Sequence, residues 1–113
     1  MDRIKQLLII LIDNAVKYTT ANGRINVILF QNGHNAMIEI SDTGIGIGQE
    51  EITRVFDRFY RGKQSRLYNP DGSGLGLSIA KLITEEHGGT ISAESQLKRG
   101  SIFRVSLPSS AAN

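Results

Sequence analysis

The stretch Asp42-Thr43-Gly44-Ile45-Gly46-Ile47-Gly48 combines one carboxylate with three glycines at every second position. It directly follows an alternating run, residues 36–41, that is typical of a β-strand. Because glycine lacks a Cβ, a flat ligand can lie against such a backbone, and Asp42 can accept a hydrogen bond from an exocyclic amine. The stretch therefore predicts a pocket with one polar anchor. A plain strand that ends in an Asp-Thr-Gly turn explains the same residues.

The length and composition of the chain limit the class of protein to which it can belong. A chain of 113 residues is long enough for one compact domain with a single core. Its 40% hydrophobic and 21% charged content is ordinary for a soluble globular domain. No cysteine is present, which excludes disulfides and thiolate metal sites. The net charge of +2 is mild, so we expect no nucleic-acid partner, and we expect neither a signal peptide nor a membrane span.

The spacing of apolar residues predicts the order of helices and strands. The predicted elements are a helix at 2–18, strands at 24–31 and 36–41, a short helix at 49–60, a helix at 75–87 and strands at 90–94 and 101–107. This order favours an α+β two-layer sandwich, with helices packed on one face of a mixed, mostly antiparallel sheet. Residues 61–73 have no periodicity, and such a long loop in a small domain is typical of a lid or binding loop.

A second glycine cluster, Gly72-Ser73-Gly74-Leu75-Gly76-Leu77-Ser78, stands between this long loop and the helix at 75–87. Backbone N–H groups at a helix N-terminus bind phosphate well when glycines leave them uncovered. The alternative is a flexible loop with a helix cap. We favour phosphate binding, because three glycines at alternate positions exceed what a cap needs.

Polar residues near the end of the first helix and in the long loop could complete such a site. Asn14, Lys17 and Tyr18 are neighbours on the last helical turns. The amide oxygen of Asn14 suits Mg²⁺, although a position at the solvent border explains it equally well. The basic side chains in or just before the long loop could contact phosphate or form an ordinary solvated loop; they are Arg58, Arg61, Lys63 and Arg66.

Taken in order, these motifs resemble the catalytic ATP-binding domain of sensor histidine kinases, which share the Bergerat ATP-binding fold with gyrase, MutL and the heat-shock chaperone ATPases. Residues 13–19 resemble the N box, 42–47 the first glycine box, 56–61 the F box and 74–81 the second glycine box. Gly100-Ser101 stands where the family usually has Gly-Thr. The F box separates histidine kinases from the gyrase and chaperone branches, and it argues against an anti-sigma-type serine kinase.

The resemblance implies ATP and Mg²⁺ as cofactors and assigns roles to individual residues. Asp42 would hold the adenine amino group and Asn14 would ligate Mg²⁺. Lys17 and Arg61 would contact phosphates, and Tyr18 would pack against the nucleotide. Residues 61–72 would form the ATP lid. The whole implied site is Asn14, Lys17, Tyr18, Asp42, Gly44, Gly46, Ile47, Phe59, Arg61, Gly72, Ser73, Gly74, Leu75, Gly76, Leu77 and Ser101.

The resemblance also implies the wider function. Residues 1–108 would be the catalytic domain and 109–113 a disordered tail. The γ-phosphoryl group would pass to a histidine on a dimerisation and phosphoacceptor domain of the same or a partner chain, with a response regulator downstream. We expect the isolated domain to be monomeric or weakly associating, and to be the cytoplasmic part of a membrane-anchored sensor.

Two departures from the family pattern qualify this prediction. Ile10 stands one turn before Asn14, where many members carry a second Asn. A nucleotide-binding regulatory module without transferase activity is therefore the alternative function. The family also usually has a strand before the first helix, and without it we expect an unpaired sheet edge that is open to association.

Overall fold

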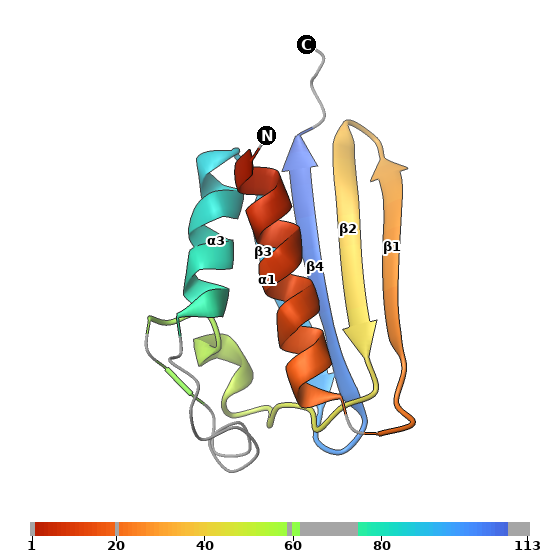
Figure 1. The fold of residues 1–113 in the computed structure, drawn as a ribbon. Coiled ribbons are helices and arrows are strands. Elements are labelled where there is room, and N and C mark those ends of the chain that lie inside the picture. Colours follow the sequence, from red (N-terminus) through yellow and green to blue (C-terminus); the bar gives the residue numbers. More distant parts are fainter. Residues whose placement is uncertain (1, 20, 59, 62–74, 109–113) are drawn as a thin grey trace.

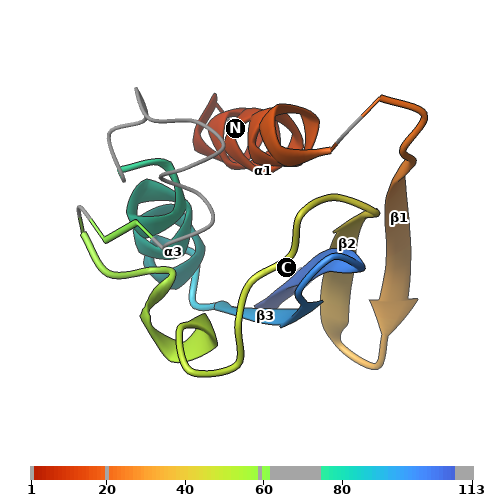
Figure 2. The ribbon, with the colours of Figure 1, turned by 90° about the horizontal axis from the view of Figure 1, so that it is seen from below.

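The structure is a computed structural model that describes residues 2–19, 21–58, 60–61 and 75–108. Two helices lie on one face of a four-stranded sheet (Figures 1 and 2). The predicted two-layer architecture is confirmed, and all pairs among the described strands are antiparallel, in the order β1-β2-β4-β3. The elements are α1 (Asp2–Tyr18), β1 (Ile25–Asn32), β2 (Asn35–Asp42), the 3₁₀ helix η1 (Ile52–Arg54), α3 (Gly76–Glu86), β3 (Thr90–Gln96) and β4 (Gly100–Pro108).

The core lies between α1, α3 and the middle of the sheet. Leu7, Leu11 and Ala15 recur at the four-residue spacing of one helix face, and each is at most 1% exposed. They pack with buried residues of β2, β4 and α3, namely Ile38, Ile40, Ala80, Ile83, Phe103 and Val105. The helix at 2–18 is confirmed with its predicted bounds. Ile12, which the apolar spacing assigns to the same stripe, is 38% exposed and lies outside this core.

The strand register decides which side chains face the helices. Ile40 of β2 lies opposite both Val27 of β1 and Phe103 of β4, so these residues share the face of the sheet that bears the helices. Asn32 and Asn35 close the β1–β2 hairpin across a two-residue turn whose Gly33 has φ +65°. Such a backbone suits glycine and is typical of tight hairpins.

The helix layer does not extend over β1. In Figure 2 this strand forms the far edge of the sheet, beyond α1. Every residue of β1 after Ile25 is exposed, whereas β2 buries Ile38 and Ile40. By the register, Ile25, Val27 and Leu29 share one face of the sheet, but little covers that face at β1.

The other face of the sheet carries a chain of charges. The Arg104 guanidinium donates to Glu39 at 2.7 Å and to Glu94 at 2.9 Å, so it joins β2, β4 and β3. These hydrogen bonds raise the pKa of Arg104 above its ordinary value. A polar network of this kind is typical of a sheet face in contact with water.

The predicted helix at 49–60 is wrong in its extent. Only Ile52–Arg54 is helical, as a 3₁₀ turn. The backbone instead makes consecutive three-residue turns, with hydrogen bonds from Glu51 to Gly48, Arg54 to Glu51 and Asp57 to Arg54. A three-residue repeat keeps Ile52 and Val55 on one side just as an α-helix does, so the apolar spacing could not distinguish the two.

Candidate functional site

Asp42 ends β2 in a buried position, directly opposite Ser101 of β4. It is 8% exposed, and its Oδ1 accepts a hydrogen bond from the Gly44 N–H at 2.8 Å. Burial raises the pKa of this carboxyl, and backbone hydrogen bonds from Gly44 and Ser101 oppose the rise. A carboxylate offers about four acceptor positions, so two backbone bonds leave room for one further donor.

The glycines after Asp42 allow main-chain segments to meet. A Cβ on Gly44 would stand 2.1 Å from the Tyr18 carbonyl oxygen. On Gly46, where φ is +76°, it would stand 2.0 Å from the carbonyl oxygen of Gln96. Both positions therefore require glycine, because no side chain fits at such distances. The glycines thus have a structural reason in the fold, whatever ligand lies nearby.

The end of α1 is fastened to this loop. The N–H of Ile45 donates to the carbonyl oxygen of Tyr18 at 3.1 Å. This bond fixes the last turn of α1, which carries half-buried Asn14, beside the residues that follow Asp42. The structure therefore brings the N box and the first glycine box together, as the resemblance implies.

Lys17 forms an ion pair within α1. Its Nζ lies 3.1 Å from Oδ2 of Asp13, one turn earlier, and both side chains are more than half exposed. An exposed pair of this spacing contributes only about 0.3–0.5 kcal/mol. Lys17 can therefore exchange Asp13 for a phosphate at little cost, and its predicted role stays a prediction.

The described part of the second glycine box begins at Leu75, the residue before α3, whose apolar side chain makes no capping hydrogen bond. A Cβ on Gly76 would meet Ile10 of α1 at 3.6 Å, which is ordinary van der Waals contact. Because Ile10 precedes Asn14 by one turn on the same helix face, the start of α3 lies near the metal-binding candidate. Leu77 is half-buried in the first turn of α3. Six candidate site residues lie outside the described ranges: Phe59, Lys63, Arg66, Gly72, Ser73 and Gly74.

The F box packs against the core through Phe56. Its ring meets that of Phe103 edge to face, with 6.0 Å between the ring centroids. Arg54 stacks over the Tyr60 ring at 4.5 Å, and the Tyr60 hydroxyl donates to Glu51 at 2.9 Å. Arg61 follows in a half-buried position, and its phosphate-binding role stays a prediction.

Ser95 joins two parts of the site and was not predicted from the sequence. Its Oγ donates to the carbonyl oxygen of Gly100 at 2.8 Å, accepts from the N–H of Ile47 at 2.7 Å and bonds to Oγ of Ser101 at 2.8 Å. The Gln49 side chain also donates to the Ser95 carbonyl oxygen. The β3–β4 hairpin is thereby tied to the first glycine loop. The alternation of residues along β3 was the available signal, because it places Ser95 on the inward face.

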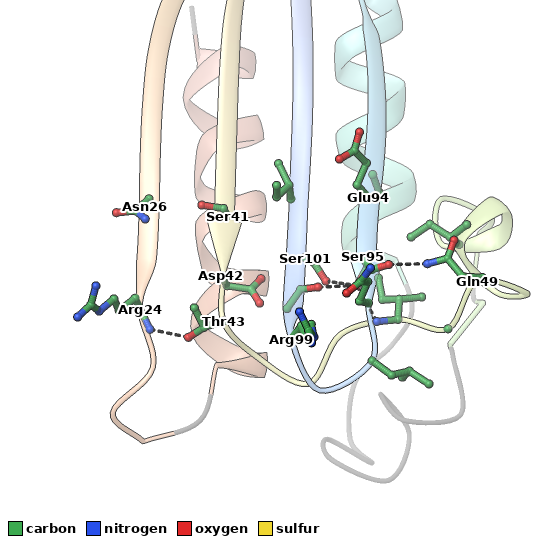
Figure 3. A pocket seen from close by; sticks show the side chains of 18 of the residues that line it. Arg24, Asn26, Ser41, Asp42, Thr43, Gln49, Glu94, Ser95, Arg99 and Ser101 are labelled. Atoms are coloured by element: carbon green, nitrogen blue, oxygen red, sulfur yellow. Dashed lines mark hydrogen bonds between the residues drawn. The ribbon is translucent and has the colours of Figure 1, made fainter.

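A cavity of about 900 Å³ lies at this end of the sheet (Figure 3). Asp42, Ile47 and Ser101 line it, but the α1 residues Asn14, Lys17 and Tyr18 do not. Its strand residues Asn26, Ser41, Glu94 and Ile102 belong by their register to the face without helices. Figure 3 shows the sheet in front of α1 in this view. Asp42 thus stands at the boundary between this cavity and the α1 side.

The sequence matches the family of histidine kinase-, DNA gyrase B- and HSP90-like ATPases over residues 1–111. The chain belongs to this family. Among curated members of this ATPase family, the sensor histidine kinase RppB of Synechocystis sp. is 45% identical over 98 residues, which cover 87% of this chain and 22% of RppB. The chain therefore spans about a fifth of the length of this relative.

Solved structures of histidine kinases have the same fold. The mycobacterial sensor histidine kinase MprB matches with a TM-score of 0.86 and 32% identity, over 95% of this chain and 72% of that one. Full-length ShkA, solved in complex with AMPPNP, matches with a TM-score of 0.79 and 29% identity, over 94% of this chain and 21% of ShkA. In the described ranges of this ATPase-family chain, no helix is long and apolar enough to cross a membrane.

Proposed function

We propose that this chain is the ATP-binding catalytic domain of a two-component sensor histidine kinase. It binds Mg-ATP and transfers the γ-phosphoryl group to a histidine on a separate dimerisation domain. The observation that carries the proposal is the bond between the Tyr18 carbonyl and the Ile45 N–H, which sets the end of α1 beside buried Asp42. Two of the boxes that the resemblance names are thereby joined by a main-chain contact.

The surroundings of Asp42 fit an adenine ring. A buried carboxylate held by main-chain N–H groups has a fixed direction, so it can select a ligand that presents an amino group. The match to ShkA in complex with AMPPNP, an analogue of ATP, supports the same ligand class.

The opposite end of the ligand fits the start of α3. The N–H groups of Gly76, Leu77 and Ser78 are the first of this helix, and the side chain of the N-cap residue Leu75 does not bond to them. Such a terminus stabilises phosphate. Asn14 would hold Mg²⁺ through its amide oxygen, and the metal would neutralise phosphate charge. Lys17 would add a positive charge after it leaves Asp13.

Transfer of a phosphoryl group depends on positioning and charge neutralisation, and these residues supply both. The accepting histidine would belong to a dimerisation domain of the same or a partner chain, and a response regulator would act downstream. The whole protein would be a membrane-anchored sensor with this domain in the cytoplasm. RppB, a sensor histidine kinase about five times as long as the match, supports such an arrangement.

Binding of a fluorescent ATP analogue, with and without Mg²⁺, tests the first half of the proposal. We expect the wild-type chain to bind, and Asp42→Asn to bind at least about tenfold more weakly, because an amide can present an N–H to the adenine amino group. Glu85→Gln, an exposed change on α3, is the matched control. Equal affinity of Asp42→Asn and wild type would show that Asp42 is not the base anchor.

Phosphoryl transfer needs a second experiment, because Ile10 favours the alternative of binding without transfer. The Ile10 side chain packs on the core and lies near the start of α3, where a polar Asn would otherwise stand. Radiolabelled ATP, the chain and a histidine-bearing dimerisation domain should give a labelled histidine. If the wild type binds ATP without labelling the histidine, and Ile10→Asn restores the labelling, the result would favour the regulatory module instead.

A further inference from the structure

Asp42, Ser101 and Ser95 form a polar row across the neighbouring strands β2, β4 and β3, at the end of the sheet where the first glycine loop begins. Asp42 pairs with Ser101, and Ser101 pairs with Ser95 on its other side. Because directly opposed residues of a sheet project to the same face, the three side chains are neighbours (Figure 3). Each residue is at most 9% exposed, so the polar row is buried.

Main-chain contacts hold the polar row in place. Gly100 brings the start of β4 against β2, since a Cβ on Gly100 would stand 1.9 Å from the carbonyl oxygen of Asp42. The backbone N–H of Ser101 bonds to the Asp42 carboxyl. At the other end of the row, the N–H of Ile47 donates to Ser95 Oγ at 2.7 Å. The positions of the three side chains are therefore set by the backbone.

The hydroxyl of Ser95 has one proton, and its contacts determine where that proton lies. The carbonyl oxygen of Gly100, 2.8 Å from Ser95 Oγ, can only accept, so it requires the Ser95 proton. Without that proton, two buried oxygens would face each other unpaired, which is unfavourable. The Ile47 N–H occupies one lone pair of Ser95 Oγ. Ser95 therefore offers its second lone pair to Ser101.

It follows that Ser101 donates to Ser95. The two hydroxyl oxygens are 2.8 Å apart, so a proton lies between them, and Ser95 has already given its own to Gly100. A serine hydroxyl ordinarily rotates and can act as donor or acceptor. In this protein the rotation of Ser101 is fixed, and its lone pairs face away from Ser95.

Asp42 and Ser101 thereby present acceptors side by side, and both residues line the same cavity. A ligand group that carries hydrogens, such as an exocyclic amine, can bond to such a pair. A carbonyl oxygen in the same place would meet lone pairs on both residues. A Ser101 hydroxyl that is held by Ser95 cannot turn to donate to it.

We propose that Ser95 is a positioning residue that determines nucleotide specificity. It fixes the Ser101 hydroxyl as an acceptor, so that the pocket takes adenine and rejects a purine with a carbonyl oxygen in place of the amino group. This inference rests on the proposed function, because it requires the base to lie against Asp42. Ser95 acts through Ser101 and not by contact with the base.

The ratio of the affinities for ATP and inosine triphosphate tests the inference, because inosine has a carbonyl oxygen where adenine has its amino group. We expect the wild type to bind ATP at least about tenfold more tightly than inosine triphosphate. Ser95→Ala should reduce this ratio at least about fivefold, since the freed Ser101 hydroxyl can turn and donate to the carbonyl oxygen. A purely structural role of Ser95 would weaken the binding of both nucleotides alike and leave the ratio unchanged.

The ratio is also insensitive to partial unfolding, because an unfolded fraction lowers both apparent affinities by the same factor. Ser95→Cys provides a second variant, in which a thiol of similar shape preserves the packing but bonds only weakly. It should change the ratio in the same direction as Ser95→Ala. Ser92→Ala, on the exposed side of the same strand, is the matched control and should keep the wild-type ratio.

A double-mutant cycle tests whether Ser95 acts through Ser101. In a Ser101→Ala background no hydroxyl remains to be fixed, so adding Ser95→Ala should change the ratio by less than about twofold. A larger change in that background would overturn the inference.

The remaining outcomes separate this inference from the proposed function. A wild type that binds neither nucleotide would overturn both. A wild type that binds ATP and inosine triphosphate equally would overturn the inference alone. The same conclusion would follow if the wild type prefers ATP and both Ser95 variants keep its ratio.

Discussion

The two glycine-rich stretches look alike in the sequence but occupy different surroundings. In the first, Gly44 and Gly46 face carbonyl oxygens that a Cβ would approach to 2.1 and 2.0 Å. In the second, the atom of the described residues that a Cβ on Gly76 would meet is a methyl group of Ile10, at 3.6 Å. The first pair of glycines is therefore required by the fold itself. The described neighbours of Gly76 leave room for a methyl group, so they do not require glycine there, and the predicted approach of a ligand to the start of α3 remains to be tested.

The difference shows that one sequence pattern can have two physical causes. Crowding by the protein's own main chain requires glycine whether or not a ligand binds. An open glycine at a helix start costs helix stability and needs another reason to be present. Substitutions that add one methyl group separate the two causes.

The largest effect is expected for Gly46→Ala. The added methyl group collides with the Gln96 carbonyl and also occupies a backbone with φ +76°, so we expect a loss of about 3–5 kcal/mol in the free energy of unfolding. Urea denaturation measures this loss. Gly33→Ala is the matched control, because its φ of +65° is similar but its surroundings are open, and it should lose about 1–2 kcal/mol. Equal losses would mean that crowding at Gly46 is unimportant.

A smaller loss is expected for Ser95→Ala. Removal of the hydroxyl leaves the Ile47 N–H and the Gly100 carbonyl without their partner in a buried position, which costs about 1–3 kcal/mol. Denaturation should show this loss, together with faster hydrogen exchange at Ile47. Ser92→Ala, on the exposed side of the same strand, should change stability by less than about 0.5 kcal/mol. A loss of stability in Ser92→Ala as large as that in Ser95→Ala would show that the hydrogen bonds of Ser95 do not tie the hairpin to the glycine loop.

Gly76→Ala should act in the opposite direction. Alanine favours the helix, and its methyl group has room beside Ile10, so we expect a gain of up to about 1 kcal/mol. ATP binding should weaken if phosphate lies against this backbone. A variant that is more stable and binds as well as the wild type would show that the glycine is not needed for a ligand.

Asp42→Asn should have the smallest effect on stability, and the size of this effect should depend on pH. Burial raises the pKa of Asp42 in the folded state above 3.8, so the folded carboxyl holds its proton more tightly than the unfolded one. Its contribution to stability is therefore greatest below pH 3.8 and declines as pH rises through the folded pKa. The amide of the Asp42→Asn variant cannot titrate. The melting temperature of this variant, measured relative to that of the wild type, should therefore increase with increasing pH. Parallel pH profiles would argue against this shift.

Much of the fold follows from apolar spacing, and the exceptions have physical causes. The bounds of α1 and the β1–β2 hairpin were predictable because Leu7, Leu11 and Ala15 repeat every turn and Asn32-Gly33 marks a tight turn. The strand order and the exposure of Val27 were not, since the first depends on pairing between distant segments and the second on where the helix layer stops. Local spacing contains no information on that boundary.

The candidate site was predictable where residue type alone defines the chemistry. Asp42 at a strand end was identified in this way, and the contact between its loop and α1 agrees with the resemblance. Ser95 was missed because a single serine in an alternating strand has no distinctive pattern. Its importance arises only from the partners that folding brings to it.

The pairing of Asp42 with Ser101 has a consequence for folding kinetics. These two residues belong to the adjacent central strands β2 and β4, yet about half of the chain lies between them. Their pairing closes a long loop, and the closure of long loops slows folding. Helix α1 can form early from local contacts, but the carboxylate has no fixed surroundings until β4 arrives. We therefore expect that, in refolding experiments, nucleotide affinity returns with the slow formation of the sheet and later than the helical signal.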